Sequence, residues 1–307
     1  MSDGEKSHGR ILYLNGTSSS GKSTLARALM DLSDEAYTHL ALDYIWSDLH
    51  SYAAKLSRSG NHVIVDNVAA LFGARNCSSF DDGFELLSDL PVILVKVDCS
   101  LDELERRERE RGDRMIGLAR IQIESVHAHG EYDLVVDTSK NSMLECAGQI
   151  SEFLKSGSPV GAYDRLRQAY EAAVDRLHDL VRTYHRAHTG KDADLAASCL
   201  AETFVNVTAG RYADPESWGA GTFQTREETC LSLADEFATD SRKYQCEIEF
   251  LRTDIQSSNA ALVTRETGGL VRPDGKMASS WEDVENIYYL TQRNDEWCIV
   301  GSLHGIG

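Results

Sequence analysis

The sequence predicts two domains in one chain, an α/β domain with a parallel sheet covered by helices on both faces, followed by an α+β domain. Two observations favour this fold class. The first half alternates short apolar runs with helical patterns, as βαβ units do. The second half opens with helical patterns and ends in a run of strand patterns separated by turn signals. At 307 residues the chain is long enough for two cores.

In the first half, short apolar runs bounded by polar or turn residues predict buried strands, and longer periodic segments between them predict helices. The strands are Ile11–Asn15, His39–Asp43, His62–Asp66, Val92–Val97 and Asp133–Asp137. The helices are Lys22–Leu32, Leu101–Arg111, Ala119–His129 and Met143–Leu154. Small and helix-breaking residues then gather at Lys155–Gly161. We therefore predict domains at 1–156 and 163–307, joined by a linker at 157–162.

The second half has a different order of elements. Helical patterns cover Tyr163–Thr189, Asp192–Cys199 and Arg226–Ala238. Strand patterns cover Phe204–Thr208, Gln245–Asp254, Ala260–Gly268, Trp281–Gln292 and Glu296–His304. Turn signals at Arg272–Gly275 and Arg293–Asp295 separate the later strands, which indicates an antiparallel meander.

Composition limits the classes of partner and the compartment. The formal net charge is -18, and such an acidic surface repels phosphate backbones and anionic lipid, so we expect neither long nucleic acid nor a membrane as partner. The 7 cysteines show no paired spacing, which favours reduced thiols over disulfides or a zinc motif. The polar opening Met1–Arg10 predicts no secretory signal, and no run is long and apolar enough to span a bilayer. We expect a cytoplasmic protein.

One motif points directly to chemistry. Gly16–Thr24 fits the pattern G-x₄-G-K-[ST], directly after a predicted strand and at the start of a predicted helix. Such glycines let backbone N–H groups turn toward phosphates, and the helix N-terminus adds a positive dipole end. The alternative is a Gly/Ser-rich turn that matches by chance. We assign ATP binding to Gly16, Thr17, Ser18, Ser19, Ser20, Gly21, Lys22, Ser23 and Thr24.

Within this motif, Lys22 is placed to bridge the β- and γ-phosphates, and the Ser23 hydroxyl is a candidate Mg²⁺ ligand. Asp66 ends the Walker-B-type run Val63–Asp66, whose aspartate usually holds Mg²⁺ directly or through water. Asp43 ends another predicted strand and is a candidate base or orienting group for an acceptor hydroxyl. Strand carboxyl ends line the ligand crevice of open α/β sheets, but either aspartate could instead cap the following helix.

Five arginines cluster between the fourth and fifth predicted strands: Arg106, Arg107, Arg109, Arg111 and Arg114. With glutamates interleaved, such a cluster is commonly a solvated helix face with i,i+4 pairs. Nucleotide kinases carry a lid at this position, where guanidinium groups stabilise charge on the transferring phosphoryl group. Gly112 permits a break in the helix. Arg111–Arg114 is placed as the end of such a lid, and we expect two of the five arginines to be catalytic.

These landmarks together resemble the chloramphenicol phosphotransferase family, over about residues 9–154. The matching stretches are Tyr13–Thr24, Leu42–Asp43, Val63–Asp66, Arg107–Arg114, Val126–His127 and Tyr132–Thr138. The resemblance implies a P-loop nucleoside-triphosphate hydrolase fold and ATP-dependent phosphorylation of a small-molecule hydroxyl. It implies Asp43 as catalytic base, Lys22 as phosphate-binding lysine, and Arg111 and Arg114 as lid arginines.

Two departures from the family bear on the acceptor. The segment between Asp43 and Val63 has room for only one short helix, whereas the drug-phosphorylating member has a longer insertion there. The family's Asp-Asp-Val appears here as Asp66-Asn67-Val68. Both differences disfavour chloramphenicol itself as the acceptor.

From about Tyr163 to Gly307 the chain resembles the nuclear transport factor 2-like/SnoaL-like superfamily. Ala260–Val263, Asp274–Gly275 and Glu296–Val300 are among the matching stretches. The resemblance implies a cone of helices against a curved antiparallel sheet, used as an enzyme, a ligand pocket or a dimerisation module. It also implies a homodimer formed through this domain. Glu266, Trp281 and His304 are candidates to face its cavity, but strand residues alternate faces, and a histidine near a terminus is more often exposed or structurally bonded than catalytic.

The sequence therefore favours an ATP- and Mg²⁺-dependent phosphotransferase acting on a small hydroxyl-bearing metabolite or antibiotic. Two alternatives stay open: a nucleotide-switched protein that binds a small molecule without phosphorylating it, and a nucleoside kinase.

Overall fold

The computed structural model describes residues 7–42, 48–74, 76–112, 115–208 and 222–305. The chain divides into two compact units, Met1–Glu171 and Ala172–Gly307. Within the described part of the chain, no helix combines the length and the hydrophobicity that a bilayer-spanning segment needs.

The N-terminal unit contains the predicted parallel sheet. Its strands lie in the order β2-β3-β1-β6-β7, and all neighbouring pairs are parallel. Their bounds are β1 Ile11–Asn15, β2 Tyr37–Ala41, β3 His62–Asn67, β6 Val92–Asp98 and β7 Leu134–Asp137. A separate two-stranded parallel pair joins β4 (Ala69–Ala70) to β5 (Ser78–Ser79). The sequence did not predict this small pair, because two-residue strands have no detectable period.

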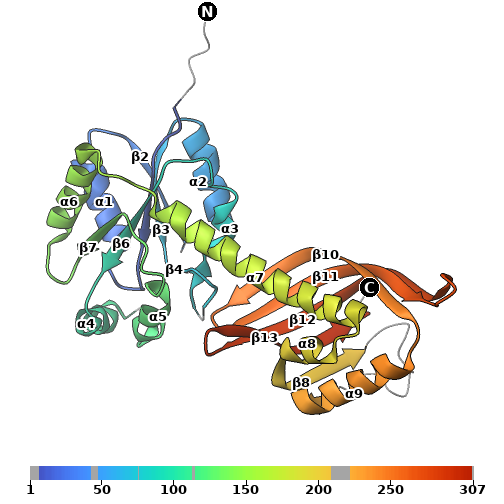
Figure 1. The fold of residues 1–307 in the computed structure, drawn as a ribbon. Helices are drawn as coiled ribbons and strands as arrows, with labels where there is room; N and C mark the ends of the chain where they lie inside the picture. The colour runs from blue at the N-terminus through green and yellow to red at the C-terminus, as the bar shows by residue number, and fades with distance from the viewer. Residues whose placement is uncertain (1–6, 43–47, 75, 113–114, 209–221, 306–307) are drawn as a thin grey trace, which may run out of the picture. The chain divides into compact units, whose positions relative to one another are not determined.

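Helices cover both faces of this sheet, as predicted (Figure 1). Along β1, Ile11 and Tyr13 point into one core, and Leu12 and Leu14 point into the other. This alternation follows from the two-residue period of a strand and explains why the run is apolar throughout. The helices are α1 Lys22–Leu32, α2 Leu49–Arg58, α3 Asp81–Phe84, α4 Leu101–Arg111, α5 Leu118–Val126 and α6 Met143–Ser156.

The long helix α7 (Ala162–Gly190) takes part in both units. Its first turns complete the core of the N-terminal unit, where Tyr163 and Leu166 are buried with Tyr13 and Phe80. Complete burial of such a side chain contributes about 1.5–3 kcal/mol. The helix therefore begins at the last residue of the predicted linker 157–162, and its first turns belong to the N-terminal unit.

The C-terminal unit has one sheet in the order β10-β11-β12-β13-β8-β9. The strands from β10 to β13 form the predicted antiparallel meander. β8 pairs with β13 in parallel, so the sheet is mixed. The bounds are β8 Leu200–Thr208, β9 Thr222–Thr225, β10 Lys243–Gln256, β11 Asn259–Val271, β12 Met277–Arg293 and β13 Glu296–His304, with α8 Ala193–Ser198 and α9 Arg226–Thr239.

The later part of α7 packs on this sheet. The His178 ring stacks on Phe250 of β10 with ring centroids 3.8 Å apart, and its Nε2 lies 2.8 Å from the Thr253 hydroxyl. Further along α7, His185 contacts tyrosines of β10 and β12. The helix and the inner face of the meander therefore enclose polar side chains.

Candidate functional site

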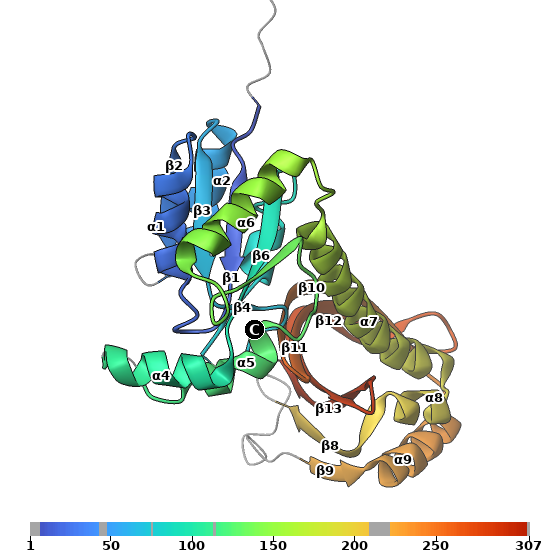
Figure 2. The same cartoon turned by 90° about the vertical axis from the view of Figure 1, so that its left-hand side faces the viewer.

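The candidate site lies at the carboxyl ends of the parallel strands. The loop Gly16–Gly21 connects β1 to α1, and Asp66 lies at the end of the neighbouring strand β3, where Leu14 is its register partner. Helices α4 and α5 lie beyond the same ends of the strands (Figure 2). This is the edge at which open α/β sheets bind ligands.

The loop adopts the conformation that its glycines and serines predict. Gly21 has φ 93 and Ser19 has φ 62, both in the left-handed region. A Cβ atom on Gly16 would lie 2.6 Å from the carbonyl oxygen of Val97, so only glycine fits there. Alternation of right- and left-handed backbone turns N–H groups toward a common point, which is the anion-binding arrangement called a nest.

Unsatisfied polar atoms gather in this loop. Among the described residues, the hydroxyl oxygens of Ser18, Ser19 and Ser20 are buried without a hydrogen-bond partner. Buried hydroxyls are normally hydrogen-bonded, so three in succession indicate a site that a polar ligand completes. Lys22 is also buried, and its ammonium donates to the carbonyl of Thr17 at 2.8 Å. Hydroxyls and a cation around an N–H-rich loop fit the phosphates of a nucleotide.

Ser23 and Asp66, the predicted metal residues, are in contact. The Ser23 hydroxyl donates to Asp66 Oδ2 at 2.5 Å, Lys22 Nζ lies 3.9 Å from Asp66 Oδ1, and His39 Nε2 lies 3.6 Å from Oδ2. Burial alone would raise the pKa of Asp66, but His39, Lys22 and Ser23 together hold it below its usual value. The carboxylate therefore stays ionised, and two adjacent oxygen donors fit a hard cation such as Mg²⁺.

Arg107 of the arginine cluster contacts the loop. Its guanidinium donates to the carbonyls of Ser19 and Ser20 at 3.4 and 3.3 Å, and to the carbonyl of Thr138 at 2.7 Å. Glu103, one turn earlier in α4, accepts from Arg107 Nε at 2.8 Å. Sequence reasoning named Arg107 only as a cluster member. Its i,i+4 spacing from Glu103 was the available signal, but spacing alone does not show which helix face meets the loop.

The predicted break after α4 is present. Gly112 caps the helix with φ 69, and α5 begins after Gly117, whose φ is 87. The fully buried Glu108 accepts from the backbone N–H groups of Gly117 and Ala119 at 2.8 and 2.7 Å. From α5, Gln122 accepts from the Ser18 N–H at 2.8 Å. A continuous set of contacts therefore joins α4, α5 and the loop Gly16–Gly21.

A cavity of about 1020 Å³ opens beside these residues. Lys22, Ser23 and Asp66 line it, and so does Arg111. Asp43 and Arg114 lie outside the described residues, although Leu42 lines the same cavity. Its wall also includes residues that sequence reasoning did not single out for this site: Arg27, His39, Val68, Met115, Leu118, Gln122 and Met143. The cavity combines a polar, cationic part with an apolar part.

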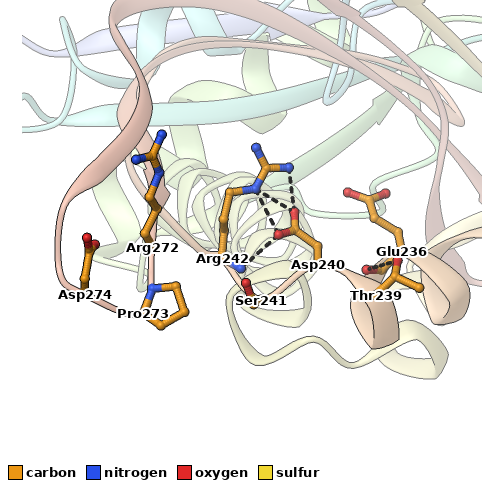
Figure 3. Close-up of a pocket in the computed structure, with 8 residues that line it drawn as sticks. All are labelled: Glu236, Thr239, Asp240, Ser241, Arg242, Arg272, Pro273 and Asp274. Atoms are coloured by element: carbon orange, nitrogen blue, oxygen red, sulfur yellow. Dashed lines mark hydrogen bonds and ion pairs between the residues drawn. The ribbon is translucent and has the colours of Figure 1, made fainter.

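The described residues of the C-terminal unit form further hollows. One is a cavity of about 420 Å³ whose lining includes Glu266, Trp281 and His304, the three residues named from the sequence. Another is a wide surface hollow between the end of α9 and the β11–β12 turn (Figure 3). There the Arg242 guanidinium already donates to both carboxylate oxygens of Asp240, at 2.7–3.0 Å, so that pair is internally satisfied.

A family model described as chloramphenicol phosphotransferase-like protein matches residues 9–55 and 47–155. The N-terminal unit contains a chloramphenicol phosphotransferase-like domain. Two curated proteins from two strains of Mycobacterium tuberculosis, each named provisionally as an O-phosphotransferase, are similar to this chain. Each is 26% identical over 201 residues, covering 53% of this chain and 89% of the relative.

Solved structures with the nuclear transport factor 2-like fold are also similar to part of the chain. One, from Pseudomonas putida, has 10% identity and a TM-score of 0.36, and the match covers 44% of this chain and 87% of that chain. Another, from Shewanella oneidensis, has 13% identity and a TM-score of 0.33, covering 43% and 98%. Both have unknown function. The likeness concerns the fold alone.

Proposed function

We propose that the chloramphenicol phosphotransferase-like domain transfers the γ-phosphate of ATP to a hydroxyl group of a small molecule. The observation that carries this proposal is the set of three buried, unpartnered serine hydroxyls beside Lys22 in the loop after β1. They are ready to bind phosphate oxygens, and the adjoining cavity of about 1020 Å³ has room for a second substrate.

Each residue of the site has a proposed role. Lys22 binds the phosphates, and Arg107 holds the loop in position. Arg111 and Arg114 stabilise charge on the transferring phosphoryl group. Ser23 and Asp66 would hold Mg²⁺, which neutralises phosphate charge when bound. Asp43 follows Leu42 of the cavity wall in sequence and is our candidate base.

In the proposed reaction, the acceptor oxygen attacks the γ-phosphorus as the bond from this phosphorus to its bridging oxygen breaks. ADP leaves, and the proton of the acceptor hydroxyl passes to the Asp43 carboxylate. The apolar side chains of Val68, Met115 and Leu118 on the cavity wall favour an acceptor with an apolar body and a free hydroxyl.

One observation favours a second function. The separate cavity of about 420 Å³ in the C-terminal unit would suit a protein that binds a small molecule under nucleotide control without phosphorylating it. A nucleoside acceptor remains a third proposal, for which the N-terminal cavity has sufficient volume.

Turnover distinguishes these proposals. ADP release is measured with ATP and Mg²⁺ across a panel of hydroxyl-bearing compounds that includes nucleosides and antibiotics. We expect at least one compound to accelerate ADP release in the wild type and not in Lys22→Ala. If a compound accelerates ADP release and an equal amount of free phosphate appears, the nucleotide-switch proposal replaces phosphotransfer.

A further inference from the structure

The cavity of the C-terminal unit has no part in the proposed phosphotransfer. α7 contributes His185 to its wall, and the meander contributes Glu266 from β11 and Tyr288 from β12. All three side chains are buried, with exposed fractions of 7%, 4% and 0%. A buried carboxylate beside a buried imidazole is costly unless a partner compensates it, so this cluster requires a physical reason.

Three side chains with metal-binding atoms converge here. One ligand atom each from His185, Cys246 and Glu266 lies within 4.8 Å of the other two. The sheet register brings two of them together. Cys246 of β10 lies opposite Gly268 of β11, and Glu266 lies opposite the residue two positions beyond Cys246. The Cys246 and Glu266 side chains are therefore diagonal neighbours on one face, and α7 adds His185 from above them.

The three donors have the chemistry of a zinc-class site. Thiolate sulfur, imidazole nitrogen and carboxylate oxygen are the ligands that Zn²⁺ takes in proteins, whereas Mg²⁺ and Ca²⁺ take oxygen ligands. Three protein ligands with a fourth position for water or substrate is the pattern of catalytic zinc sites. Here His185 and Glu266 both line the cavity, so the fourth position can be reached from it.

Neighbouring hydroxyls orient His185 and Glu266. Tyr244 OH lies 2.9 Å from His185 Nδ1, and Tyr288 OH lies 2.7 Å from Nε2. A metal on Nε2 takes the place of the Tyr288 contact, and Nδ1 then donates to Tyr244. Thr264 and Tyr288 both donate to Glu266 Oε1 at 2.9 Å. The other carboxylate oxygen, Oε2, is the one that Cys246 Sγ approaches at 3.8 Å. Such outer partners are typical of metal-binding histidines and carboxylates.

We propose that His185, Cys246 and Glu266 bind a transition-metal ion of the zinc class, with its fourth coordination position open to the cavity of the C-terminal unit. Zn–ligand bonds are about 2.0–2.3 Å long, so the three ligand atoms would draw together by about 1 Å on binding. The site is independent of the phosphate-binding loop, and the proposal stands whether or not the N-terminal domain transfers phosphate.

The test is a titration of the full-length chain with Co²⁺ alone after treatment with a chelator. Co²⁺ bound to a thiolate in a four-coordinate site gives a sulfur-to-metal charge-transfer band in the near ultraviolet and intense visible bands. We expect both to saturate at one Co²⁺ per chain and to disappear when Zn²⁺ is added. Absence of the charge-transfer band in the wild type overturns the proposal.

Variants identify the ligands. Cys246→Ser should abolish the charge-transfer band. Cys298 is a half-buried thiol of the same sheet, and Cys298→Ser should retain the band. Cys77→Ser is a second control, because Cys77 lines the phosphate-site cavity, where Co²⁺ could also bind. A band that survives in Cys246→Ser, or disappears in Cys77→Ser, contradicts the proposed site. Circular dichroism spectra establish that each variant is folded.

Tyr244→Phe tests the site without removing a ligand. Loss of the hydroxyl beside His185 Nδ1 should retain the charge-transfer band and weaken Co²⁺ binding by about 10- to 100-fold. Unchanged affinity in this variant contradicts the assignment of His185 as a ligand through Nε2. The variant keeps all three proposed ligands, so the comparison is made between folded proteins.

Discussion

At the scale of single residues, Arg107 contacts the loop Gly16–Gly21. Its guanidinium contacts the carbonyls of Ser19, Ser20 and Thr138, whereas Arg109 on the same helix is exposed. We predict that Arg107→Ala raises the KM for ATP about tenfold or more, because charge-assisted hydrogen bonds contribute about 1.5–3 kcal/mol each. Steady-state kinetics measures this, with Arg109→Ala as the control. Equal KM values in the two variants contradict the role of Arg107.

A second residue prediction concerns pH. His50 is buried, its Nε2 lies 2.9 Å from the Tyr13 hydroxyl, and burial lowers its pKa from 6.5 to about 4. Between these values the unfolded chain binds a proton that the folded chain does not, so the free energy of unfolding falls as the pH is lowered. At about 1.4 kcal/mol per pKa unit, the loss is roughly 3 kcal/mol.

Urea denaturation from pH 7 to pH 4 measures this effect. His50→Gln should flatten the dependence, although the variant itself is less stable at neutral pH. The exposed His8→Gln is the control and should leave the slope unchanged. A wild-type slope that His50→Gln does not reduce would show that other groups cause the acid sensitivity.

At the scale of elements, a buried carboxylate of α4 holds the start of α5. Glu108 accepts two backbone N–H groups there, and nothing in a charged run such as Leu101–Arg111 identifies it as buried. We predict that Glu108→Ala lowers the free energy of unfolding of the N-terminal unit by about 2–4 kcal/mol. Amide exchange should quicken first in α5. The exposed Glu110→Ala serves as control, and equal exchange rates in the two variants would refute the capping role.

Local patterns predicted most elements, because buried strands and amphipathic helices carry their periods in the sequence. β1, α1, α4 and β13 have the predicted bounds. β11 extends to Val271, beyond its predicted end at Gly268. The prediction stopped at Gly268 because glycine ends an apolar pattern. In the sheet a Cβ there would lie 2.2 Å from the carbonyl oxygen of Gln245, so glycine is what the close strands require. The parallel pairing of β8 with β13 joins segments distant in sequence and has no local signal.

In the candidate site, too, the sequence predicted some residues and not others. The motif predicted the loop and the importance of Lys22 and Ser23, and the place of Asp66 at the carboxyl end of a predicted strand predicted that it would lie near them. The proximity of His39, Arg107 and Gln122 to this site depends on side chains from separate elements, which no spacing encodes. The roles of Asp43 and Arg114 stay predictions. So does the homodimerisation of the C-terminal domain, which light scattering can measure.

At the scale of the whole molecule, the boundary along the chain between the two compact units falls within α7, at Glu171 and Ala172. A fragment that ends at Gly161 lacks Tyr163 and Leu166, which are buried in the core of the N-terminal unit. We predict that this fragment unfolds at a lower temperature than one that ends at Glu171, because each lost side chain removes about 1.5–3 kcal/mol of burial. Calorimetry of both fragments decides; identical unfolding temperatures would place the boundary before α7.

The central claim concerns the fate of the γ-phosphate. The most direct measurement uses ATP labelled with ¹⁸O in that group, incubated with the protein, Mg²⁺ and a metabolite extract, followed by mass spectrometry of the products. We predict a labelled phosphate monoester of a small molecule with the wild type, and none with Lys22→Ala. Label found only in inorganic phosphate, with no labelled ester, would contradict phosphotransfer to a hydroxyl.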